Sequence, residues 1–111
     1  MIAALFAVCV GFLPLPAFAT ALKSVRMHEA PDSTRVVFDT DAAVTYKIFT
    51  LEDPHRVVVD LQGVSPRPGF DPAVVAVGRA RVASLRAADR NGNYRVVIDT
   101  KTQLTPKAFT L

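Results

Sequence analysis

Groups that commonly carry out catalysis or bind metals are scarce in this chain of 111 residues. It holds one cysteine, Cys9, and two histidines, His28 and His55, which are not spaced as a pair of metal ligands. A structural zinc site needs four ligands, and His28 beside Glu29 is more typical of a solvated pair. The sequence also lacks a G-x-S-x-G motif and a glycine-rich phosphate loop. We therefore expect no catalytic site, metal or cofactor in this chain.

Charge is absent from the first 22 residues, where an apolar run ends in the small-x-small sequence AFA. This pattern predicts a secretory signal peptide over residues 1–19, cleaved after Ala19. A membrane anchor of about 20 apolar residues is the alternative, but Pro14 and Pro16 interrupt the run before the cleavage site. No Lys or Arg precedes the apolar run, so we expect the leader to start upstream of Met1. Cleavage would remove Cys9 and leave residues 20–111 as a thiol-free domain without a stable membrane anchor, suited to the bacterial periplasm.

The formal net charge is +3, and the arginines gather in the second half of the chain. A positive field favours anionic partners such as carboxylate-bearing polymers, lipid headgroups or nucleic acid. Export of the chain from the cytoplasm argues against nucleic acid as its partner. A solvated surface without a partner is the alternative, which composition alone favours.

A sequence repeat organises the rest of the chain. Residues 22–51 and 82–111 align without a gap and share about 12 identical pairs, among them Ser24/Ser84 and Arg26/Arg86. The first copy continues through a further strand-like run at 56–61, and the second copy has no such continuation. We therefore divide the domain into repeat one, 22–61, a linker rich in proline and glycine, 62–81, and repeat two, 82–111, which we expect to lack its last strand.

Short runs rich in Val, Ile, Phe, Thr and Tyr between turn residues predict β-strands. The expected strands are 22–28, 35–40, 44–51, 56–61, 82–87, 94–100 and 104–111. In the linker, Asp71 and Pro72 favour a short helix over Ala73–Val77, ending before Gly78. Two such units can each bury one face, so we predict an all-β sandwich of two related four-stranded sheets, one per repeat, with seven strands present.

One pentapeptide occurs three times in these strands: RVVFD at 35–39, RVVVD at 56–60 and RVVID at 95–99. Side chains alternate along a strand, so the second and fourth residues should face the core while Arg and Asp share the outer face, about 13 Å apart. Each Asp follows an Arg, which favours the ionised form and argues against a general acid. The outer face could hydrogen-bond sugars and peptide carboxylates. Cross-strand ion pairs with only a structural role are the alternative.

The R-V-V-x-D strands, the K-x-F-T-L sequence at 47–51 and 107–111, and the L-x-x-P-x-R-V-V-x-D-L stretch at 51–61 resemble the AMIN domain. Domains of this family precede the zinc-dependent catalytic domain of periplasmic N-acetylmuramoyl-L-alanine amidases, and also occur in type IV pilus secretins. The resemblance implies a β-sandwich that binds peptidoglycan and targets an amidase to the division site, with a secretin module as the alternative. It also implies that division-site proteins are partners, and that zinc belongs to a separate amidase domain. Carried over by position, the peptidoglycan-binding candidates are Arg35, Asp39, Lys47, Arg56, Asp60, Arg95, Asp99 and Lys107.

Overall fold

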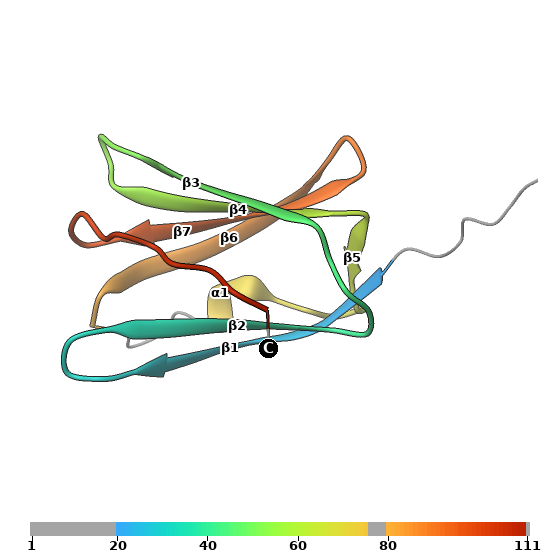
Figure 1. Cartoon of the computed structure of the whole chain (residues 1–111), viewed down its shortest axis with the longest axis horizontal. Helices are drawn as coiled ribbons and strands as arrows, with labels where there is room; N and C mark the ends of the chain where they lie inside the picture. Colours follow the sequence, from blue (N-terminus) through green and yellow to red (C-terminus); the bar gives the residue numbers. More distant parts are fainter. Residues whose placement is uncertain (1–19, 76–79, 111) are drawn as a thin grey trace, which may run out of the picture.

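The computed structural model describes residues 20–75 and 80–110 (Figure 1), so the predicted signal peptide and Ala19 lie outside the described residues. The described part of the chain forms the strands β1 (Thr20–Glu29), β2 (Thr34–Thr40), β3 (Tyr46–Leu51), β4 (Arg56–Gln62), β5 (Val64–Pro66), β6 (Val82–Arg90) and β7 (Asn93–Thr100), and the short helix α1 (Pro72–Val75). In this part of the molecule, no helix is long and apolar enough to cross a membrane.

The strands form two layers (Figure 1), which confirms the predicted all-β sandwich. Sheet A has three strands in the order β2-β1-β5, and sheet B has four in the order β3-β4-β7-β6. The expectation of one four-stranded sheet per repeat was wrong, because β3 and β4 of repeat one belong to sheet B, where β4 pairs with β7 of repeat two. Alternation along a strand shows which side chains are buried, but it does not show which strand lies alongside.

The repeat survives in two equivalent hairpins, β1–β2 in sheet A and β6–β7 in sheet B. Each hairpin is antiparallel, and each register shifts at the same position, between Leu22 and Ser24 in β1 and between Val82 and Ser84 in β6. A bulge at this point turns the side chains that follow it. The two hairpins therefore present matching residues on opposite sheets.

The core lies between the sheets and follows the predicted alternation. In β4, Val57 and Val59 are buried, and in β7 Val96 and Ile98 are buried. The equivalent residues of β2 are half-buried and pack against the same core, which also contains Leu22, Leu85 and Tyr94. The core-facing positions of all three R-V-V-x-D strands are thus as predicted.

Two segments differ from the expected strands. Val64–Pro66, within the predicted linker, forms β5 and runs parallel to the start of β1, where Val64 is buried. Pro66 is tolerated because β5 is an edge strand. The strand expected at 104–111 was wrong over the residues described, since 101–110 contain no strand. There Pro106 replaces the residue that corresponds to Tyr46 and removes a backbone N–H donor.

The linker helix begins as predicted. The Ala73 amide donates to Asp71 Oδ1 at 3.0 Å, which caps the first turn of α1. The expected end of the helix, Val77 and Gly78, lies outside the described residues.

Candidate ligand-binding faces

Each sheet carries a polar face that points away from the core. Face A, on sheet A, comprises Ser24, Arg26, Arg35, Val37 and Asp39. Face B, on sheet B, comprises Lys47, Phe49, Arg56, Val58, Asp60, Ser84, Arg86, Arg95, Val97 and Asp99. Cations outnumber carboxylates on both faces, so each face favours ligands with acidic groups or many hydrogen-bond acceptors.

On face A, Asp39 holds Arg26 and Ser24 in one cluster. Arg26 donates from Nε to Asp39 Oδ2 at 2.7 Å and from Nη2 to Oδ1 at 3.0 Å. Ser24 Oγ donates to the same Oδ2 at 2.7 Å. This arrangement fixes the guanidinium plane, while the Arg26 side chain stays 53% exposed. A guanidinium has five N–H donors, so three remain for a ligand.

Face B repeats this cluster in the second hairpin. Arg86 donates from Nε to Asp99 Oδ2 at 2.8 Å and from Nη2 to Oδ1 at 2.9 Å, and Ser84 Oγ donates to Oδ2 at 2.5 Å. The Arg86 side chain is 59% exposed. Both clusters, here called the Ser–Arg–Asp clusters, thus use the same atoms in the same order and leave the same N–H groups free.

A further paired arginine lies only on face B. Arg95 donates from Nε and Nη2 to the two oxygens of Asp60, at 2.7 and 2.8 Å, across the β4–β7 boundary. Its guanidinium carbon lies 5.6 Å from the centre of the Phe49 ring, within range of a cation–π interaction. Val58 beside this pair is only 2% exposed although it points outward. Asp60 and Phe49 therefore hold the Arg95 guanidinium in one orientation on this part of face B.

The arginines hold all three carboxylates in their ionised form. The pKa of Asp39 is lowered to about 2, first by the hydrogen bond from Arg26 and then by that from Ser24. The pKa of Asp99 is lowered chiefly by Arg86, and that of Asp60 chiefly by Arg95, in each case against a smaller opposing effect of burial. These carboxylates therefore orient arginines and are unsuited to donate a proton near neutral pH.

The predicted site residues occupy different environments. Arg35 and Asp39 lie on face A, and Lys47, Arg56, Asp60, Arg95 and Asp99 lie on face B. Arg56 donates to the carbonyls of Pro54 and Glu52 in the β3–β4 turn, at 3.1 and 3.3 Å. Among the described residues, Arg35 and Lys47 form no side-chain hydrogen bond. Lys107 lies in the exposed segment 101–110, apart from either sheet.

Sequence reasoning missed four of the six residues in the Ser–Arg–Asp clusters: Ser24, Arg26, Ser84 and Arg86. It predicted that Asp positions Arg side chains and named cross-strand ion pairs as the alternative, but it did not identify Arg26 and Arg86 as the arginines that Asp39 and Asp99 bind. The sequence did contain an indication of these residues, because the Ser-x-Arg pair occurs at the same position in both repeats.

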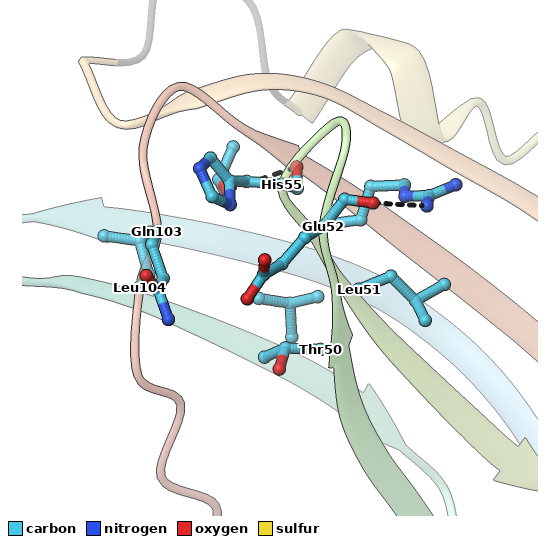
Figure 2. Close-up of a pocket in the computed structure, with 9 residues that line it drawn as sticks. Thr50, Leu51, Glu52, His55, Gln103 and Leu104 are labelled. Atoms are coloured by element: carbon cyan, nitrogen blue, oxygen red, sulfur yellow. Dashed lines mark hydrogen bonds between the residues drawn. The ribbon is translucent and has the colours of Figure 1, made fainter.

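One shallow pocket lies at the end of sheet B, beside the β3–β4 turn (Figure 2). It is lined by Thr50, Leu51, Glu52, His55, Arg56, Val57, Thr100, Gln103 and Leu104. Its volume of about 10 Å³ accommodates roughly one water molecule. This pocket is therefore too small to enclose a sugar ring or a peptide. In the part of the chain that the structure describes, no group of three or more His, Cys, Asp or Glu side chains could hold a metal ion.

The fold and the two faces define a duplicated β-sandwich that displays one Ser–Arg–Asp cluster on each sheet. The chain belongs to the AMIN domain family, whose model matches residues 24–111, and this confirms the resemblance seen in the motifs. It is also 30% identical over 99 residues to the N-acetylmuramoyl-L-alanine amidase AmiC of Escherichia coli O6:H1. That match covers 79% of this chain but only 22% of the length of the amidase.

Proposed function

We propose that this chain is a non-catalytic module that binds peptidoglycan and directs an N-acetylmuramoyl-L-alanine amidase to the division site in the periplasm. There it would serve cell-wall hydrolysis and the separation of daughter cells. The likeness to AmiC supports the amidase context. Any zinc-dependent cleavage would belong to a separate domain.

The two Ser–Arg–Asp clusters are the observation that carries the proposal. Each presents an exposed guanidinium that a carboxylate and a serine hold in place. Preorganised guanidinium groups bind carboxylates in two-pronged geometry and also donate to carbonyl and hydroxyl oxygens. Peptidoglycan offers all of these, as carboxylates and carbonyls of its stem peptides and hydroxyls of its glycan strands.

The region around Arg95 extends the same surface. Its guanidinium is paired with Asp60 and stacks on Phe49, so little conformational entropy is lost when a ligand contacts it. The unpaired Arg35 and Lys47 can add attraction for acidic groups, one on each face. We include all the predicted binding residues except Lys107 in the proposed surface.

Co-sedimentation of residues 20–111 with purified sacculi at moderate salt tests binding. The wild-type domain should pellet with the sacculi, and the double variant Arg26→Ala/Arg86→Ala should remain mostly in the supernatant. Binding is ruled out if the wild type stays in solution.

Targeting needs a separate test. A fluorescent fusion of the domain, exported to the periplasm, should concentrate at mid-cell in dividing cells. Even fluorescence around the envelope would contradict septal targeting and leave peptidoglycan binding intact.

A further inference from the structure

We propose that the domain is bivalent, with face A and face B each binding a separate peptidoglycan strand, so that one chain bridges two strands. This inference rests on the proposed function and adds the number of peptidoglycan strands that one domain binds. A bivalent module would hold an attached enzyme between neighbouring strands of the polymer.

The duplication of the cluster is the first argument. Corresponding hydrogen bonds differ by at most 0.2 Å between Arg26, Ser24 and Asp39 on one sheet and Arg86, Ser84 and Asp99 on the other. Each arginine keeps more than half of its side chain exposed. Whatever acceptor group one cluster binds, the other has the same donors for it.

The placement of the two clusters is the second argument. The hairpins that carry them, β1–β2 and β6–β7, lie in opposite layers (Figure 1). The cluster residues face away from the core, in which Leu22, Leu85 and Val96 are fully buried between the layers. Packed sheets are about 10 Å apart, and the arginines extend outward from both. A strand of polymer that lies along one face therefore cannot reach the other, so that filling both clusters requires two strands.

The two faces should differ in strength. Face B carries the additional Arg95–Asp60 pair and the Phe49 ring, whereas the described part of sheet A has no counterpart to them. We expect face B to bind more tightly. Engagement of both faces on the same sacculus should then raise the apparent affinity by about 10²- to 10⁴-fold over that of one face.

A bridging assay separates bivalency from binding. Sacculi are incubated with residues 20–111, washed, and offered fluorescent soluble glycan strands that carry stem peptides. The wild type should capture labelled strands on the sacculi. Arg26→Ala and Arg86→Ala, which are matched to each other by the repeat, should each still pellet with sacculi, at least tenfold more weakly, but capture no labelled strands.

The outcomes are distinguishable. A wild type that pellets with sacculi without capturing strands would overturn bivalency and leave the proposed function in place. Capture that persists in either single variant would likewise overturn the assignment of one strand to each cluster. A wild type that fails to pellet would overturn both proposals. The melting temperature of each variant, measured in parallel, shows whether lost capture reflects lost folding.

Discussion

Arg81 joins the two sheets at one end of the sandwich, and its removal should destabilise the domain. Its Nη1 lies 3.0 Å from the carbonyl oxygens of Ala30 and Ser33 and 3.2 Å from Thr34 Oγ1, and Nη2 donates to the carbonyl of Pro31. One guanidinium just before β6 thus fastens the whole turn between β1 and β2.

The size of the effect follows from these contacts. A hydrogen bond from a charged donor contributes about 1.5–3 kcal/mol, and several bonds from one half-buried group do not add fully. We expect Arg81→Ala to lower the free energy of unfolding by about 2 kcal/mol, and the melting temperature of a domain this size by roughly 10 °C.

Thermal and urea unfolding followed by circular dichroism measures this change. The control is Arg90→Ala, at the exposed end of β6, where the described structure gives the side chain no hydrogen bond. The control should change stability by less than about 0.5 kcal/mol. Equal stability of the Arg81 and Arg90 variants would refute the role of Arg81 as a link between the sheets.

Three further predictions concern stability. Because Asp39, Asp60 and Asp99 have pKa values below the unfolded value of about 3.9, the stability they provide is present above that value and lost as pH falls toward 2; a melting temperature unchanged between pH 5 and 2.5 would contradict this. Leu85→Ala, at a core position only 1% exposed, should cost about 3 kcal/mol in urea unfolding, and a loss below about 1 kcal/mol would show that this core is loosely packed. A peptide of residues 54–62, which contains β4, should pair with β2, whose described pairing is with β1 alone. The melting temperature should then rise with increasing peptide concentration. A scrambled peptide should have no effect, and equal effects of the two peptides would exclude specific pairing.

Much of the fold could be read from local pattern. The three R-V-V-x-D strands assign core and outer positions correctly, because a two-residue period fixes which side chains point together. The turn at Asn91 and Gly92 was also predictable, because Asn and Gly tolerate the positive φ that tight hairpin turns require. The two residues adopt φ values of 52° and 84° there.

The arrangement of strands depends on contacts distant in sequence. Val64 is part of a sheet only because it pairs in parallel with Thr20, 44 residues earlier, and nothing in its proline-rich surroundings indicates a strand. β4 likewise joins sheet B by pairing with β7 of the other repeat, where Asp60 lies opposite Arg95 and accepts its hydrogen bonds.

The same limit applies to the candidate site. Sequence spacing placed the Arg and Asp of each strand on one face, about 13 Å apart, but it did not show which side chains of the neighbouring strand they contact. Antiparallel pairing with a bulge brings Asp39 against Ser24 and Arg26. The residues of the clusters could therefore be recognised as identical positions of the two repeats. Which of them lie together could be predicted only once the register of the hairpin was known.

Nuclear magnetic resonance can show whether the Ser–Arg–Asp clusters themselves contact peptidoglycan. Isotope-labelled residues 20–111 are titrated with soluble glycan–peptide fragments while amide and arginine Nε–H resonances are followed. We expect concentration-dependent shifts of the Arg26 and Arg86 Nε–H groups and of the amides of Ser24 and Ser84, with the Arg81 Nε–H unchanged. Shifts confined to the β3–β4 turn, or none on either face while sacculi are bound, would contradict it.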